Sequence, residues 1–127
     1  MKKSLSIFTL VILVLGLVAL SAKKPAKTNS SMPDDVKAVI DNSCYGCHNS
    51  ESRNEDGKKA LQFDTFEELT TIKKIHAYKE IEEVLDESEM PPKKFLERFP
   101  DKALNEDDKK LLMDWSKKEA EALVKGM

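Results

Sequence analysis

Hydrophobic and polar positions divide the chain into an apolar leader, a polar connector and an amphipathic body. Residues 4–22 carry no charge and are dominated by Leu, Val and Ile. Residues 22–32 are polar or small and show no apolar period, which predicts a flexible linker. From residue 33 onward, apolar residues recur at helical spacing between short breaks, and no stretch alternates as a strand would. The pattern predicts one all-α domain over residues 33–127.

Helices are expected at both ends of this body. Pro33 and the two aspartates after it suit the first turn of a helix, because the free N–H groups there favour negative charge. The apolar face of this helix is expected to hold Val36, Val39, Ile40 and Ser43. Asn105 is expected to cap a long C-terminal helix whose first turn is acidic. The core face of that helix is expected to hold Leu111, Leu112, Trp115, Ala122 and Leu123.

The middle of the body is expected to begin with a loop and continue with a capped helix. Residues 49–59 are strongly hydrophilic, which predicts a loop. Thr65 and Glu68 have the spacing of a capping box, in which each side chain satisfies a free backbone donor. Leu69 and Ile72 are expected to continue the apolar face of the helix that follows.

A further helix is predicted by Ile81, Val84 and Leu85, which fall on one helical face. Pro91 and Pro92 are expected to end it, because proline lacks the backbone donor that a helix needs.

Composition and the leader bear on compartment and partners. Of the 127 residues, 35% are charged and 40% are hydrophobic, and the net charge is −2. This charge argues against a nucleic-acid-binding protein, whose binding surface is basic. Lys2 and Lys3 precede the apolar run and small residues surround Ser21, which predicts a signal peptide over residues 1–21. The alternative is an uncleaved membrane anchor, because residues 4–22 are about long enough to span a bilayer. Either way the body is expected in the periplasm, soluble or tethered to the outer face of the inner membrane.

The segment Cys-Tyr-Gly-Cys-His at residues 44–48 has the spacing at which c-type haem is attached. The thiols of Cys44 and Cys47 would each add to one vinyl group of a single haem. His48 would then lie beside the iron and supply a nitrogen ligand. Gly46 is expected to leave room for the chain to bend against the ring.

Three other interpretations of the two cysteines remain. A thioredoxin-like redox pair needs a βαβ context, and no strand is predicted. A zinc site needs two further ligands, and His76 is the only histidine elsewhere. A disulfide in an exported protein is the third. Haem is favoured because the motif occurs together with an export signal and an all-helical body. A flat apolar ring would also supply the core that a small charged body lacks. We therefore expect the haem-free chain to be poorly folded.

Met90 is the preferred sixth ligand of the iron. The two prolines after it stiffen its loop, and a stiff loop can hold a weak sulfur ligand. His76 is the main rival because imidazole binds haem iron more strongly than a thioether, and an open or water-bound position is the third option. The remaining methionines of the body and its linker are less suitably placed; they are Met32, Met113 and Met127.

Residues Asp34–Leu123 resemble a monohaem c-type cytochrome, and more narrowly the haem-binding domain family of exported bacterial cytochromes. The resemblance rests on the haem motif, a Leu-x-Phe segment, a Met-Pro dipeptide and a tryptophan in the last helix. These residues are Cys44, Tyr45, Cys47, His48, Leu61, Phe63, Met90, Pro91 and Trp115. The family usually carries a stretch rich in Trp, Pro and Tyr after the motif, where this chain is hydrophilic. The resemblance implies covalent haem c, ligation by histidine and methionine, and electron transfer.

The function expected from these features is that of an electron carrier that exchanges single electrons with redox partner proteins and is not an enzyme. The alternative is a haem-based sensor or binding module with a displaceable sixth ligand. A peroxidase is disfavoured, because it needs a distal acid or base over an open iron site. Candidates for packing on the ring are Phe63, Phe66, Tyr78, Phe95 and Trp115. Candidates for pairing with haem propionates, or for docking a partner, are Lys93, Lys94 and Arg98.

Overall fold

The computed structural model describes residues 32–127, which form one compact unit. The predicted leader (1–21) and all but the last residue of the predicted linker lie outside the described residues. In chain order the elements are α2 (Asp34–Ser43), α3 (Glu55–Ala60), the 3-10 helix η1 (Phe66–Glu68), α4 (Thr71–Asp86), α5 (Lys93–Leu96), the 3-10 helix η2 (Pro100–Lys102) and α6 (Glu106–Lys125). No strand occurs within residues 32–127, so the all-α prediction is confirmed. No helix in this range has both the length and the apolar character needed to cross a bilayer.

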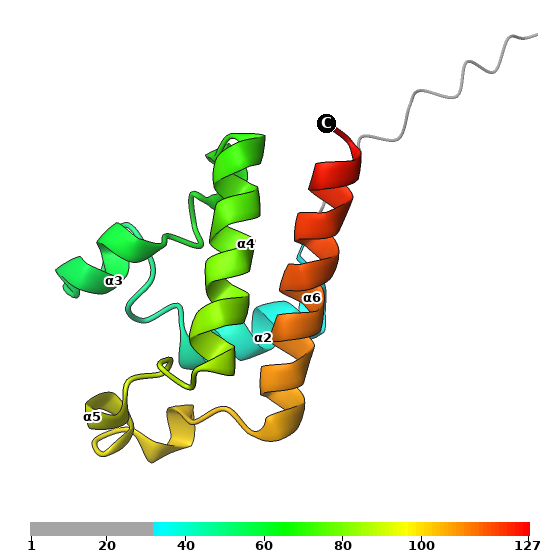
Figure 1. Ribbon diagram of the computed structural model, residues 1–127. Helices are drawn as coiled ribbons and strands as arrows, with labels where there is room; N and C mark the ends of the chain where they lie inside the picture. The colour runs from blue at the N-terminus through cyan, green and yellow to red at the C-terminus, as the bar shows by residue number, and fades with distance from the viewer. Residues whose placement is uncertain (1–31) are drawn as a thin grey trace, which may run out of the picture. The chain divides into compact units, whose positions relative to one another are not determined.

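Two long helices form the frame of the unit. Figure 1 shows α4 and α6 running side by side in opposite directions, with α2 crossing them. The short helices α3 and α5 lie on the side of α4 that faces away from α6. The unit therefore has a three-helix part and a part built from loops and short helices.

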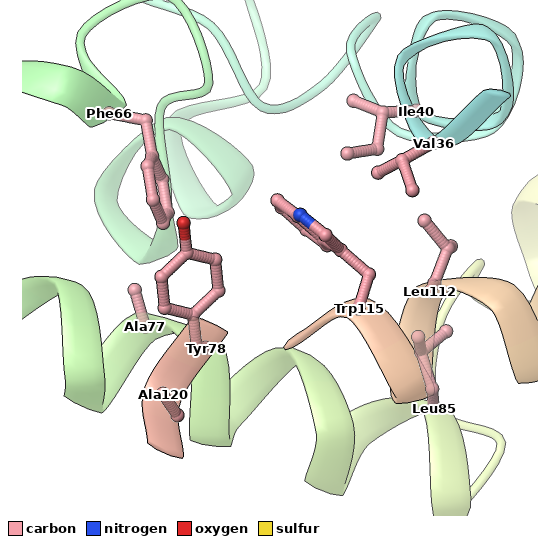
Figure 2. Close-up of a cluster of buried hydrophobic side chains, with 9 residues drawn as sticks. All are labelled: Val36, Ile40, Phe66, Ala77, Tyr78, Leu85, Leu112, Trp115 and Ala120. Atoms are coloured by element: carbon pink, nitrogen blue, oxygen red, sulfur yellow. The ribbon is translucent and has the colours of Figure 1, made fainter. Parts of the chain in front are cut away.

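The hydrophobic core lies between α2, α4 and α6, with one aromatic side chain added from η1 (Figure 2). The ring of Tyr78 lies 5.0 Å from Phe66 and 5.1 Å from Trp115, centroid to centroid, and meets Trp115 edge to face. Such aromatic pairs add to the free energy gained by burial alone. The full set of buried hydrophobic residues is Val36, Ile40, Phe66, Ala77, Tyr78, Leu85, Leu112, Trp115 and Ala120.

The expected start of α6 is confirmed. Asn105 caps the helix, because its Oδ1 accepts a hydrogen bond of 2.7 Å from the backbone N–H of Asp108. The core face of α6 differs from the expected one at one position. Ala122 is exposed, and Ala120 is buried instead. The buried stripe runs from Leu112 to Ala120 at helical spacing, and Ala122 lies off this stripe.

The capping box expected at Thr65 is wrong. Thr65 makes no side-chain cap, and only the short 3-10 helix η1 follows it. The long helix begins later, where Thr70 Oγ1 accepts from the backbone N–H of Lys73 at 3.4 Å. The interruption places Phe66 in the core. Ile72, expected on the apolar face, is 67% exposed.

The prediction of a loop over residues 49–59 is also partly wrong, because α3 begins in the second half of this range. Asn54 begins this helix, and its Oδ1 accepts from the N–H of Gly57 at 2.9 Å. Two acidic residues in the first turn and two lysines in the last turn match the helix dipole. The helix has no apolar face, which is why periodicity did not reveal it.

Helix α4 ends at Asp86, before the prolines that were expected to end it. Ser88 adopts a positive φ of 57°, and its N–H donates to the carbonyl of Leu85. The N–H of Glu89 donates to the carbonyl of Val84 at 2.9 Å. These two bonds form a Schellman motif, which turns the chain out of the helix.

Candidate functional site

Two neighbouring cavities lie between α4 and the segment that carries the Cys-x-x-Cys-His motif. Their volumes are about 110 and 390 Å³, and the larger value falls within the range of small-molecule sites. Both cavities are lined by Cys44, His48, Ala60, Leu85 and Met90. The fold thus brings the motif and Met90, which are far apart in the sequence, to one place.

The walls of both cavities are largely apolar. Additional apolar side chains of the smaller cavity are Ile40, Leu61, Phe63, Ala77, Ile81, Val84 and Leu112. Additional apolar side chains of the larger cavity are Pro91, Pro92, Phe95 and Leu104, and Cys47 also lines it. Apolar walls with a few polar groups are typical of cofactor sites.

A tight turn carries the motif at the end of α2. Cys44 is the C-cap of this helix, and its N–H donates to the carbonyl of Ile40 at 2.8 Å. The N–H groups of Cys47 and His48 both donate to the carbonyl of Cys44 at 3.1 Å. The turn therefore keeps both thiols and the imidazole close to the end of a rigid helix.

The imidazole of His48 is oriented by the segment after α3. Its Nδ1 lies 3.2 Å from the carbonyl oxygen of Leu61. A carbonyl can only accept a hydrogen bond, so this contact matches the neutral tautomer in which Nδ1 carries the proton and Nε2 offers its electron pair. Histidines that bind metals are usually held in this way. The N–H of Phe63 donates to the carbonyl of His48 at 3.0 Å, and the two rings meet edge to face.

A second contact between the same segments involves Asp64. The backbone N–H of Ser50 lies 3.1 Å from each carboxylate oxygen of Asp64, and the Ser50 hydroxyl also donates to this carboxylate. These hydrogen bonds lower the pKa of Asp64, and the one from the Ser50 hydroxyl has the largest effect. Residues 48–50 are therefore held along residues 61–64. No local sequence pattern predicts this contact.

Gly57 is a site residue that sequence reasoning missed. A Cβ at this position would lie 2.7 Å from the carbonyl oxygen of Cys47, which is too close for any side chain. The backbone of α3 therefore packs directly on the motif. Gly46 was the glycine singled out from the motif, but a Cβ there would have no protein atom within 4 Å. A close approach between distant segments leaves no signal in the local sequence.

No disulfide joins Cys44 and Cys47. Burial raises the pKa of the Cys44 thiol to about 11, and the neighbouring Cys47 adds to the shift. Thiol–disulfide exchange requires a thiolate, so a thiol that is protonated at neutral pH is a poor redox nucleophile. No group of three or more His, Cys, Asp or Glu side chains within residues 32–127 is arranged to hold a metal ion.

The rival sixth ligand lies elsewhere. His76 is 73% exposed in its side chain, and its Nδ1 lies 3.5 Å from Glu80 Oε1. It lines a third cavity, which His48 does not reach. Among the other methionines, Met113 lines a separate cavity and Met127 is exposed. Met90 is therefore the only one of the considered ligands that lines both cavities beside His48.

The candidate aromatic residues divide into two groups. Phe63 lines the smaller cavity and Phe95 the larger one. Phe66, Tyr78 and Trp115 line neither cavity and belong to the core. The candidate cations of the α5 region line neither cavity either; they are Lys93, Lys94 and Arg98.

Comparison with known proteins decides the family. A family model described as a haem-binding domain matches residues 52–118, which is more than half of the chain. The chain belongs to this haem-binding domain family. The matched part of the haem-binding domain contains α3, α4, Met90, α5 and Trp115. It begins after His48, so the match is independent of the Cys-x-x-Cys-His motif. Comparisons with curated proteins and with solved structures each gave no match.

The residues around the cavities of this haem-binding domain fit a haem. The walls are apolar, as a porphyrin face requires, and an imidazole with a free Nε2 and a thioether are both present. Haem iron accepts both of these donors. Haem is thus the cofactor that family membership and the donor set support.

Proposed function

We propose that the protein is a c-type cytochrome that holds one haem covalently through Cys44 and Cys47 and transfers single electrons outside the cytoplasm. The observation that carries this proposal is that His48 and Met90 line the same two apolar cavities as Cys44. Membership of the haem-binding domain family supports the cofactor. The predicted leader supports the location.

When bound, haem supplies an iron that alternates between the ferrous and ferric states. His48 and Met90 are the residues that would hold this iron, through the imidazole Nε2 and the thioether sulfur, because both line the same cavities. A thioether is a weak donor and favours the ferrous state relative to a second imidazole. The hydrogen bond from His48 Nδ1 to Leu61 fixes the ring and keeps Nε2 available.

The cysteines would provide attachment. Cys44 lines both cavities and Cys47 lines the larger one, so two thioether bonds would fasten the cofactor to the end of α2. A ligand bound only to the folded chain also stabilises that fold. Redox partner proteins would donate and accept the electrons, and the protein would not itself act as an enzyme.

The test is an optical and chemical analysis of protein matured in a host that attaches haem. We expect a haem that resists extraction by acid acetone and a weak near-infrared band from methionine bound to ferric iron. Met90→Ala should abolish this band, whereas the control substitutions Met113→Ala and His76→Ala should preserve it.

Two results would contradict the proposal. Survival of the band in Met90→Ala would show that Met90 is not the ligand. Ready binding of carbon monoxide to the unmodified protein would favour a sensor or binding module, because a carrier with both axial positions filled should bind it poorly.

A further inference from the structure

We propose that a third cavity, between α3 and α4, is the site that holds the carboxylates of the bound cofactor. This inference rests on the proposed function and adds to it the chain's own partners for the haem propionates. The cavity has a volume of about 360 Å³. Its charged lining residues are Lys58, Lys59, Lys73 and Glu80, and His76 also lines it.

The position of this cavity follows from the residues that it shares with its neighbours. It shares Ala60, Leu61, Ala77 and Glu80 with the smaller of the two cavities beside the motif. It shares only Ala60 with the larger one. The three cavities thus form a row, with the smaller motif cavity in the middle.

The cysteines mark one end of this row. Cys47 lines only the larger motif cavity, Cys44 lines both motif cavities, and neither lines the third. In haem the two propionates lie on the edge of the ring away from the two vinyl groups. A ring fastened through its vinyl groups at the cysteine end would therefore direct its carboxylates toward the third cavity.

The charges of the third cavity suit carboxylates. Lys59 and Lys73 line it, and neither makes an ion pair with any residue in the described range 32–127. Lys58 is 27% exposed and pairs with Glu55 at 2.8 Å. A carboxylate brought out of water needs such partners, because an unpaired buried charge is costly.

The remaining polar groups are compatible with this assignment. Glu80 is the only acidic residue in the lining of the third cavity, and it lies 3.5 Å from the His76 ring nitrogen. Gln62 and Thr65 also line the cavity. The Thr65 hydroxyl donates to Gln62 Oε1, and one N–H of Gln62 donates to the carbonyl of Lys58, so a second N–H of Gln62 remains as a donor. The cavity therefore offers three lysine side chains against one glutamate.

The other group of cations is less well placed. Lys93 and Lys94 lie on α5, and neither lines the cavities that contain the motif or the third cavity. The side chain nearest the cavities from this helix is Phe95. The third cavity thus replaces α5 as the preferred partner of the propionates.

The test compares two double substitutions with the same change of charge in the matured protein. Lys59→Gln with Lys73→Gln removes the free cations of the third cavity, and Lys93→Gln with Lys94→Gln is the control. Resonance Raman spectroscopy reports the bending bands of the haem propionates, and spectroelectrochemistry reports the reduction potential. We expect the first variant to shift the propionate bands and lower the potential, because nearby positive charge stabilises the ferrous state. We expect the control to leave the bands in place.

The result that would overturn the inference is an unshifted propionate band in the Lys59 and Lys73 variant, or a shifted one in the control. The failure of the proposed function looks different. In that case the unmodified protein would lack haem that resists extraction or would lack the methionine-to-iron band. Circular dichroism checks that both variants keep the helical fold, as expected for substitutions of exposed lysines.

Discussion

The two sides of α4 are held together in different ways. On the side of α6, α2 and α4 share nine buried hydrophobic residues with α6 and η1. On the side of the cavities, α3 buries only Gly57, and α5 buries no residue. That second side is held by backbone hydrogen bonds, by the contacts of Asp64 and by half-buried side chains such as Leu61 and Phe63. The difference indicates that one side folds on its own packing, whereas the other depends on what occupies the cavities.

Withholding haem should produce the largest difference between the two sides of α4. We expect the amides of α3 and α5 to exchange with solvent as in an unfolded chain, while amides of α4 and α6 keep measurable protection. The reason is that only the second pair has a packed core, and regions with few buried contacts open first. Hydrogen exchange of the haem-free and matured proteins, followed by mass spectrometry, would measure the difference. Equal protection of both regions without haem would contradict the comparison.

A truncation in the core should have the next largest effect. Trp115→Ala removes a 6% exposed indole that packs on Tyr78, and we expect the free energy of unfolding to fall by about 3–5 kcal/mol. Ile72→Ala is the control, because Ile72 is 67% exposed, and we expect a change of about 0.5 kcal/mol. Urea unfolding monitored by circular dichroism provides both values. Similar losses in the two variants would mean that the core is not where the stability lies.

Substitutions at two glycines near the motif test whether the backbone of α3 packs on it. Gly57 lies against the motif, whereas Gly46 has open space around it. Gly57→Ala places a Cβ 2.7 Å from the carbonyl oxygen of Cys47, so we expect a loss of about 1–3 kcal/mol and a weaker methionine-to-iron band. A Cβ at Gly46 would have no protein atom within 4 Å, so we expect Gly46→Ala to leave the packing of the polypeptide nearly unchanged. Urea unfolding of the matured protein and its near-infrared spectrum test both. An unchanged stability of Gly57→Ala would mean that α3 does not pack on the motif as described.

The smallest effect is expected from Asp64 and depends on pH. Its pKa is lowered in the folded state by Ser50, so the ionised carboxylate adds stability above the unfolded pKa of about 3.9. This contribution is lost as the pH falls through the lower folded pKa. Asp64→Asn should therefore be less stable than the unmodified protein at neutral pH, and the difference should shrink in acid. Urea unfolding across this pH range measures it.

The control for this prediction is Asp101→Asn. The carboxylate of Asp101 lies at the surface, 3.6 Å from Lys102 Nζ, and only the backbone carbonyl of this residue contacts α2, through the amide of Asn42. A constant difference for Asp64→Asn at every pH would show that its charge does not contribute.

How much could be predicted from the sequence depended on whether the signal was local. The cap at Asn105 and the buried Leu112 and Trp115 were predicted correctly, because a cap and a helical stripe each leave a short-range pattern. Helix α3 was missed because a helix without an apolar face has no period to detect. The end of α4 was placed too late because proline is visible in a sequence, whereas a left-handed serine is not.

The candidate site follows the same rule. The motif residues and Met90 were chosen from spacing and ligand chemistry, and the structure places them around shared cavities, although their roles as ligands stay predictions. Gly57, Leu61 and Asp64 were not predicted to support the motif. Each acts on a segment distant in the sequence, so only the folded backbone reveals it.

The hydrogen bond between His48 and Leu61 has a consequence for tuning. Leu61 is the C-cap of α3 and directly follows its last residue, so a movement of that helix would also move the carbonyl that contacts the imidazole. A stronger bond would make the imidazole a better electron donor and a weaker bond a poorer one. If haem is bound as proposed, a partner that displaces α3 would change the strength of this hydrogen bond. The reduction potential of the iron would then shift, and with it the driving force for electron transfer.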